Sequence, residues 1–422
     1  MTSPEMAQAA MWSIAALAVS GVIVRPWRVP EVVWAIAGAS ALVGFGLLPW
    51  QQAVHAIGKG FDVYLFLTGM MLLSELARRE GLFEFLAAHA VNVARGSPSR
   101  MFLLTYAIGT VVTVFMSNDA TAVVLTPAVY AAARRARATP LPYLFACAFI
   151  ANAASFVLPI SNPANLVIFG TDMPPLRQWL AQFAVPSALA IAATFAAHRV
   201  LQRGALRGTI DAGIPVPALS HSGATTGYGI AAVAVALLVA SSRGMPLGWP
   251  TLAVTTLVAA MVLLGKRESP LATLRGVSWD VLLLVAGLFV LVEGLQATGV
   301  TDVLTALLQA ASDRSLTGTT WGAGIAVAVA SNLVNNLPMG LIAGVLVDGA
   351  QVDTLIRGAI TIGVDLGPNL SVTGSLATIL WLTAIRREGE HVSAWTFLRL
   401  GVVVMPAALL FALAGLFVVH GF

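Results

Sequence analysis

The chain has 422 residues, of which 58% are hydrophobic and 10% are charged, and its mean hydropathy is +0.87. An ordinary soluble domain carries about 25% charged residues, so this composition excludes a soluble globular protein and indicates a polytopic membrane protein. The single cysteine, Cys147, excludes an internal disulfide and any metal site built from several thiolates, and no cofactor is expected. The net charge of +4 is assigned to cytoplasmic loops and not to nucleic-acid binding.

Ten apolar segments approach the length needed to cross a bilayer, and two of them are long and broken. They cover approximately residues 6–24, 31–48, 61–77, 143–170, 179–198, 227–241, 247–265, 279–295, 355–385 and 396–419. Two further apolar stretches, 101–133 and 319–349, are interrupted at their centres by polar residues. Each of these two is typical of a re-entrant hairpin that enters and leaves on the same side. The predicted fold is therefore all-α, with ten transmembrane helices, two re-entrant hairpins and two broken helices.

The first hairpin carries the polar run Ser117–Thr121, which places an amide and a carboxylate at membrane depth. Such groups are costly in a bilayer unless they line a protein cavity or a water-filled path. The second hairpin carries Asn335 and Asn336 at its centre. We therefore expect the two hairpin tips to form opposite halves of one binding site.

The two halves of the sequence repeat, and corresponding residues lie 218 positions apart. Residues 61–81 align with residues 279–299, and the same offset places Asn118 on Asn336. Five predicted crossings separate the copies, so the second copy is inverted relative to the first, as in many secondary transporters. The predicted organisation is a first repeat at 1–201, a cytoplasmic linker at 202–226 and a second repeat at 227–422.

The basic residues predict the orientation. With the N-terminus outside, 18 of the 23 Lys and Arg residues fall on the inner side, which agrees with the positive-inside rule. The outer side receives only Lys59, Arg177, Arg243, Arg314 and Arg357. Both termini are therefore expected on the periplasmic or extracellular side, with the first hairpin opening inward and the second outward.

Proline and glycine break the two long segments at Pro159, Pro163, Gly367, Pro368 and Gly374. Broken helices expose N–H and C=O groups that can bind a polar solute. Asn, Ser and Thr side chains add matching donors and acceptors, which suit a small hydroxylated solute that is neutral or weakly anionic. The predicted substrate-binding residues are Ser117, Asn118, Thr121, Asn162, Asn165, Asn335, Asn336, Thr373 and Ser375.

Asp119 and Asp365 are the carboxylates within these interruptions, one in each half. Burial favours the protonated form of a carboxylate, so either residue could load and release a proton. The alternative is that each stays ionised and caps the N-terminus of a half-helix. Asp119 is favoured for coupling, because its counterpart in the second repeat is Leu337 and not a second acid.

The polar breaks also resemble those of a known family. The segments 335–338 (Asn-Asn-Leu-Pro), 363–369 (Gly-Val-Asp-Leu-Gly-Pro-Asn) and 374–382 resemble the ArsB-type arsenite/antimonite efflux permeases of the ion transporter superfamily. Asn118–Asp119 followed by 125–127 (Leu-Thr-Pro), and Ser161–Asn162 with 165–167 (Asn-Leu-Val), fit the same pattern. The resemblance extends over essentially the whole chain.

This resemblance implies a scaffold domain plus a transport domain in the inner membrane, and a transporter rather than an enzyme. It implies export of trivalent arsenic or antimony, as neutral hydroxides, in exchange for protons. Members of this family work alone or with a separate soluble ATPase. A sodium-coupled importer of di- or tricarboxylates and a channel subunit driven by an ATPase are the alternatives, and the oligomeric state is left open.

Overall fold

A computed structural model describes residues 4–170 and 173–421. These residues form helices and turns without a strand, so the predicted all-α class is confirmed. The helices of the first half are α1 (Pro4–Val24), α2 (Glu31–Gly44), α3 (Trp50–Lys59), α4 (Phe61–Arg79), α5 (Leu82–Ala94), α6 (Pro98–Phe115), α7 (Asn118–Ala120), α8 (Thr126–Arg135), α9 (Leu141–Ala153), α10 (Pro163–Phe169) and α11 (Leu176–Leu201). Those of the second half are α12 (His221–Ser242), α13 (Gly248–Lys266), α14 (Pro270–Gly276), α15 (Asp280–Ala297), α16 (Val300–Arg314), α17 (Leu316–Val334), α18 (Asn336–Ala350), α19 (Thr354–Leu366), α20 (Leu376–Arg387) and α21 (Ala394–Val419).

Within the described residues, six helices are long and apolar enough to cross a membrane. The number is up to seven if α3 and α4, which meet at a bend of 49°, form one span. Other predicted spans do not meet a length criterion because they are broken: α9 and α19 have 13 residues each, and α20 has 12. A criterion based on the length of single helices misses spans that are broken. The number of ten transmembrane segments therefore stays a prediction.

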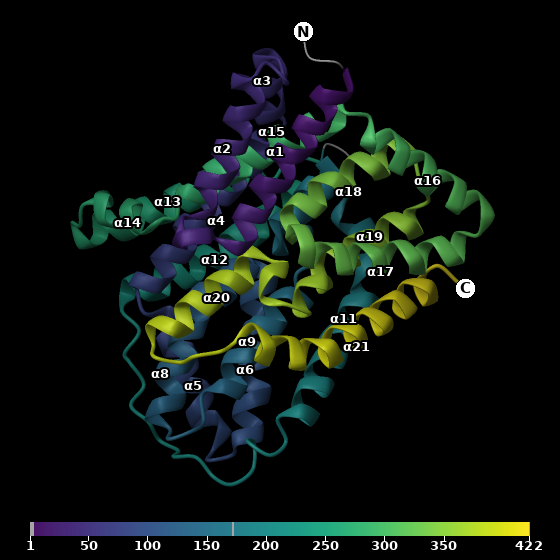
Figure 1. The fold of residues 1–422 in the computed structure, drawn as a ribbon. Coiled ribbons are helices and arrows are strands. Elements are labelled where there is room, and N and C mark those ends of the chain that lie inside the picture. The colour runs from purple at the N-terminus through teal and green to yellow at the C-terminus, as the bar shows by residue number, and fades with distance from the viewer. Residues whose placement is uncertain (1–3, 171–172, 422) are drawn as a thin grey trace.

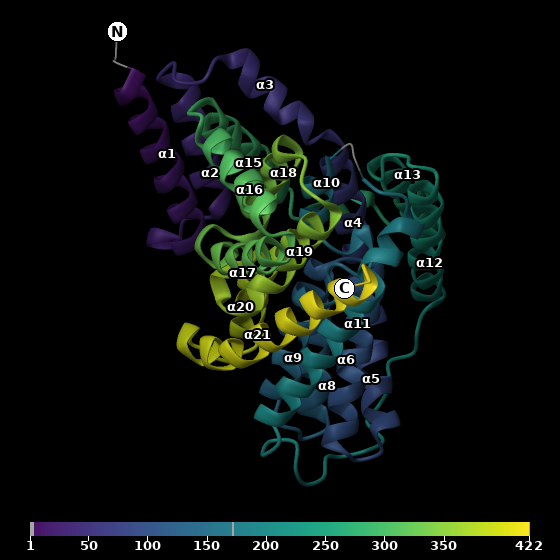
Figure 2. The same ribbon diagram turned by 90° about the vertical axis from the view of Figure 1, so that its right-hand side faces the viewer.

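The observed helix bounds repeat at the offset found in the sequence. Gly81 and Gly299, which correspond at this offset, precede α5 and α16 with φ values of 71° and 77°. Glycine adopts this left-handed conformation without a steric penalty, so both helices begin with the same sharp turn. The helices α11 and α21 begin and end at corresponding positions too, and they lie side by side in the structure (Figures 1 and 2).

The broken helices repeat at a second, shorter offset of 213 positions, at which Leu141 corresponds to Thr354. This offset relates α9 to α19, the turns Pro159–Ser161 and Val372–Gly374, and the first residues of α10 and α20. The first offset does not align these segments, because the second half has fewer residues between its hairpin tip and its broken helix. The stretch from Asn336 to the start of α19 is shorter than the stretch from Asn118 to the start of α9. At the second offset, Asn152 is the counterpart of Asp365.

The chain reverses direction at the tip of the first hairpin. The helix α6 ends at Phe115, and the return arm begins at Asn118 and continues through a π-helical segment (Thr121–Leu125) into α8. The hydroxyls of Thr113 and Thr121 lie 2.8 Å apart across the two arms. The arms therefore hold each other by side-chain hydrogen bonds inside an apolar bundle.

The connection between the two halves is an ordered strap. The helix α12 begins at His221, inside the predicted linker, which is therefore shorter than expected. The amide of Ile210 donates to the carbonyl of Gly96 (3.0 Å), and the amide of Asp211 donates to the carbonyl of Ala136 (2.8 Å). Leu206 and Ile214 are buried. The strap therefore pairs with the turns at the end of the α5, α6 and α8 bundle, at the bottom of Figure 1.

Candidate functional site

The first turns of four helices meet at one small cavity of about 30 Å³. The four helices are α7 and α18, which begin at the hairpin tips, and α10 and α20, which begin after the helix breaks. Each N-terminus presents free N–H groups and a partial positive charge. The lining residues are Leu67, Asn118, Asp119, Asn162, Pro163, Val281, Val285, Asn336, Leu337, Leu376 and Ala377.

Both hairpin tips are reversed by a residue with positive φ. Ser117 has a φ of 150° and Asn335 a φ of 73°, and the two residues correspond at the first repeat offset. Each side chain then caps the helix that follows: Ser117 accepts from the amide of Ala120, and Asn335 from the amide of Leu337. The next residues, Asn118 and Asn336, face the cavity. Asn118 Oδ1 is buried and has no hydrogen-bond partner among the described residues.

Asn162 connects the cavity to a buried carboxylate. Its Oδ1 accepts from the amide of Ala164 and caps α10, and its Nδ2 donates to Asp365. Pro163 occupies the first position of α10, where the missing amide donor has no cost. Asp365 is fully buried at the end of α19 and does not line the cavity. The side chain of Asn162 therefore contacts both the small cavity and Asp365.

Asn152 and Asn369 are buried site residues that the sequence interpretation missed. Asn152 Nδ2 donates to Asn369 Oδ1 at 3.0 Å and to Thr378 Oγ1 at 3.3 Å, and Asn152 Oδ1 accepts from Ser375 at 3.4 Å. Asn369 in turn donates to the carbonyl of Phe149 at 3.1 Å. These bonds join α9 of the first half to the break and to the start of α20 in the second half. For Asn152, the signal in the sequence was an amide near the end of the otherwise apolar run 141–153.

Asn332 fixes the second hairpin to the second break. Its Nδ2 donates to the carbonyls of Ala328 (2.8 Å) and Gly367 (3.0 Å), and its Oδ1 accepts from the hydroxyl of Ser371 (2.6 Å). The Thr373 hydroxyl donates to the carbonyl of Asn332 at 3.1 Å. The tip and the break are therefore cross-linked by hydrogen bonds, which restricts independent movement of either segment.

Of the predicted substrate-binding residues, the structure places Asn118, Asn162 and Asn336 at the small cavity, together with Asp119. Thr121, Asn165 and Ser375 are fully buried and hydrogen-bonded to other parts of the chain. Asn335 donates to the carbonyl of Thr373 at 3.4 Å. The residues predicted to break helices lie at the observed breaks, where the glycines are needed: a Cβ on Gly374 would lie 2.5 Å from Pro368.

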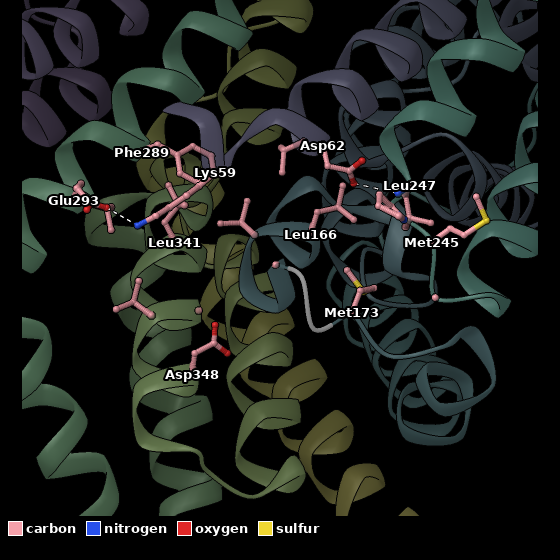
Figure 3. Close-up of a pocket in the computed structure, with 18 of the residues that line it drawn as sticks. Lys59, Asp62, Leu166, Met173, Met245, Leu247, Phe289, Glu293, Leu341 and Asp348 are labelled. Atoms are coloured by element: carbon pink, nitrogen blue, oxygen red, sulfur yellow. Dashed lines mark hydrogen bonds and ion pairs between the residues drawn. The ribbon is translucent and has the colours of Figure 1, made fainter. Parts of the chain in front are cut away.

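A larger pocket of about 660 Å³, whose lining is drawn in Figure 3, lies one helical turn away from the small cavity. Four helices line both spaces with residues three or four positions apart. The pairs, with the larger pocket first, are Val63 and Leu67 on α4, Leu166 and Pro163 on α10, Phe289 and Val285 on α15, and Leu341 and Leu337 on α18. The large pocket, called the vestibule below, thus lies next to the small cavity along these four helices.

The charges of the vestibule are paired. Lys59 Nζ lies 2.8 Å from Glu293 Oε2, as drawn in Figure 3. Asp62 accepts from the amides of Leu247 and Gly248 and caps α13. Asp348 pairs with Arg357. Among the described lining residues of the two spaces, Lys59 is the sole Lys or Arg, so neither space offers a free cation to an anionic ligand.

Comparison with known proteins gives the family. A family model described as a citrate transporter, CitMHS, matches residues 14–363. The chain belongs to this family of transporters. The arsenical pump membrane protein of Yersinia enterocolitica is 29% identical to the transporter over 396 residues, which are 90% of this chain and 91% of that one. The protein of the same name from Escherichia coli K12 is 30% identical over 366 residues, with coverages of 82% and 84%.

A crystal structure supports the fold of the transporter. The YdaH transporter of Alcanivorax borkumensis superposes with a TM-score of 0.59, covers 88% of both chains and shares 16% sequence identity. At this identity the likeness concerns the fold alone. Together with the apolar helices, these relatives make the chain a multi-pass membrane transporter.

Proposed function

We propose that this transporter exports trivalent arsenic or antimony, as the neutral trihydroxide, across the inner membrane in exchange for protons. In this proposal the hairpin tips and helix starts around the small cavity hold the metalloid. Asp119 or Asp365 exchanges a proton in each cycle. The observation that carries the proposal is a polar cavity formed by four helix N-termini and lined by three amides and one carboxylate, without a Lys or Arg among its described residues.

A trihydroxide matches the hydrogen-bonding groups of this cavity. Its hydroxyl protons can be donated to the unpartnered Oδ1 of Asn118 and to the carboxylate of Asp119. Its oxygens can accept from the amide side chains and from free N–H groups at the helix starts. A cavity of about 30 Å³ has room for little more than a water molecule, so the site opens further to admit the substrate.

The same cavity is poorly suited to citrate or another polycarboxylate. An ionised Asp119 would place a negative charge at the lining, and like charges repel strongly where water is excluded. Helix N-termini can bind a carboxylate, and Arg or Lys commonly adds the full positive charge that pairs with it. The sole Lys of the vestibule lining is already paired with Glu293. These features favour a neutral polyhydroxide over the substrate in the family model's description.

The decisive assay is arsenite uptake into everted membrane vesicles with an acidic lumen. Because everted vesicles expose the cytoplasmic face, export appears as uptake, and we expect accumulation that collapses when the pH gradient is dissipated. A hundredfold excess of citrate should leave the uptake unchanged. Absence of pH-driven uptake would contradict the proposal. Uptake that requires a sodium gradient, or ATP with a soluble ATPase, would identify one of the alternative mechanisms.

A further inference from the structure

The two broken helices contact each other through two related polar clusters. In the first, Asn152 of the first half contacts Ser375 and Thr378 of the second half. In the second, Asp365 of the second half contacts Asn162 of the first half, and Asn165 lies beside the same carboxylate. Each residue of one cluster corresponds to a residue of the other at the second repeat offset. The clusters differ at each position: the amide of Asn152 corresponds to the carboxylate of Asp365, and the hydroxyls of Ser375 and Thr378 correspond to the amides of Asn162 and Asn165.

The hydrogen bonding of the two clusters is unequal. Both polar atoms of the Asn152 amide have partners. In the other cluster, Asp365 Oδ2 and Asn165 Oδ1 have no partner among the described residues. Both side chains are fully buried. Two buried acceptors without a donor are costly, and one added proton, bound to Asp365 and donated to Asn165, would satisfy both.

No cationic side chain neutralises Asp365 within the described part of the chain. The helices packed against α19 are α9, α10, α17, α18 and α21. Their ionisable residues are Tyr143, Cys147, Asp348 and Arg399, and α19 itself carries Arg357. Arg357 pairs with Asp348, and Tyr143 donates to the carbonyl of Pro98. Among the described residues, the charge of an ionised Asp365 therefore has no cationic partner.

We propose that Asp365 and Asn165 together form the coupling-proton site, and that each transport cycle carries one proton through it. This inference rests on the proposed proton-coupled export. A proton needs one donor and one acceptor oxygen, which the pair supplies. Hard metal cations such as Mg²⁺ and Ca²⁺ take six or more oxygen ligands, and this cluster has only two unpartnered acceptors among the described residues. The fully bonded Asn152 cluster provides no second site.

Asn162 transmits the protonation state to the substrate cavity. Its amide donates to Asp365, and the same residue lines the cavity and caps α10. An ionised Asp365 holds this amide more strongly than a protonated one, because hydrogen bonds to charged groups are about twice as strong. Loading the proton therefore weakens the hydrogen bond that holds Asn162. Proton binding at Asp365 and metalloid binding in the small cavity are thus coupled through the side chain of Asn162, although the two sites share no ligand.

The test uses proteoliposomes that contain the full chain and compares two activities. The first is arsenite accumulation driven by a pH gradient, and the second is arsenite exchange at equal pH on both sides. We expect Asp365→Asn to lower driven accumulation at least tenfold while exchange persists and no longer varies with pH. Asp313→Asn, the same change at an exposed residue of α16, should behave like the wild type.

A second variant tests the role of Asn165. Asn165→Leu keeps the branched shape of the side chain and removes the acceptor for the proton. The proton is then held less tightly, so the midpoint of the pH dependence of exchange should move about half a unit to lower pH. This measurement does not depend on the behaviour of the Asp365 variant. A midpoint that stays constant or moves to higher pH overturns the shared site.

The outcomes separate this inference from the proposed function. Wild-type protein that does not accumulate arsenite under a pH gradient contradicts the proposed function itself. Wild-type accumulation together with accumulation within twofold in Asp365→Asn overturns the inference alone. Complete loss of exchange at every pH in a monodisperse Asp365→Asn protein also overturns it, because the residue is then required for substrate movement and not for coupling.

Discussion

The neighbouring residues Asn335 and Asn336 have different structural roles. Asn335 adopts a φ of 73°, caps the start of α18 and donates to the carbonyl of Thr373. Asn336 is the first residue of α18 and lines the small cavity. A site interpretation based on composition cannot separate them, because both are asparagines in the same interruption. The backbone conformation distinguishes their roles, because only Asn335 has a positive φ and Asn336 already belongs to α18.

This difference gives a prediction for substrate affinity. Asn336→Ala removes an amide from the cavity and should raise the KM for arsenite about tenfold, which corresponds to about 1.4 kcal/mol. Asn335→Gly should change the KM far less, because glycine tolerates positive φ and the lost side chain faces the chain itself. Transport kinetics in everted vesicles measure both values. An equal increase in the two variants would show that the cavity is not the binding site.

Residue chemistry made the positions of the breaks predictable, because Pro and Gly disrupt helices wherever they occur in a long apolar segment. It also identified the four polar cavity residues among the candidates. The partners of those residues were not predictable. Asn152 contacts Asn369 across 217 positions, and its match to Asp365 is hidden because the repeat offset changes between the hairpins and the broken helices. Such pairings depend on how the two halves pack.

At the scale of helices, the second break is held by close packing of α19 on α17. Gly363 and Gly367 are one helical turn apart and face the backbone of α17. A Cβ at Gly363 would lie 2.4 Å from the carbonyl oxygen of Gly324, and one at Gly367 would lie 2.4 Å from that of Ala328. Small residues at this spacing allow helices in membranes to approach closely. This contact sets the position of Asp365 and of the break.

Gly363→Ala therefore should separate α17 from α19. The clash is with backbone atoms, which cannot move aside as a side chain can, so we expect a loss of roughly 2 kcal/mol in stability. Gly322→Ala is the matched control on α17, because its Cβ would have no neighbour within 4 Å. Thermal unfolding in detergent should show a lower Tm only for Gly363→Ala. Equal Tm values would contradict the close packing.

At the scale of the whole molecule, the vestibule and the strap lie at opposite ends. The vestibule is lined near the ends of α3, α15 and α18, which lie toward the top of Figure 1, whereas the strap runs along its bottom. Two of the basic residues assigned to the outer side, Lys59 and Arg357, belong to ion pairs with vestibule residues. If the charge distribution sets the orientation as proposed, the vestibule opens to the periplasm and the strap lies in the cytoplasm.

Two single cysteines test this orientation in a Cys147→Ala background, since Cys147 is buried and is the chain's one cysteine. Met245, exposed by 49%, lies at the vestibule, and the side chain of Asp211, exposed by 54%, lies on the strap. A membrane-impermeant maleimide should label Met245→Cys in intact spheroplasts and Asp211→Cys only in everted vesicles. The background protein without either cysteine should stay unlabelled in both. Labelling of Asp211→Cys in intact spheroplasts would show that the chain has the opposite orientation. The vestibule would then face the cytoplasm.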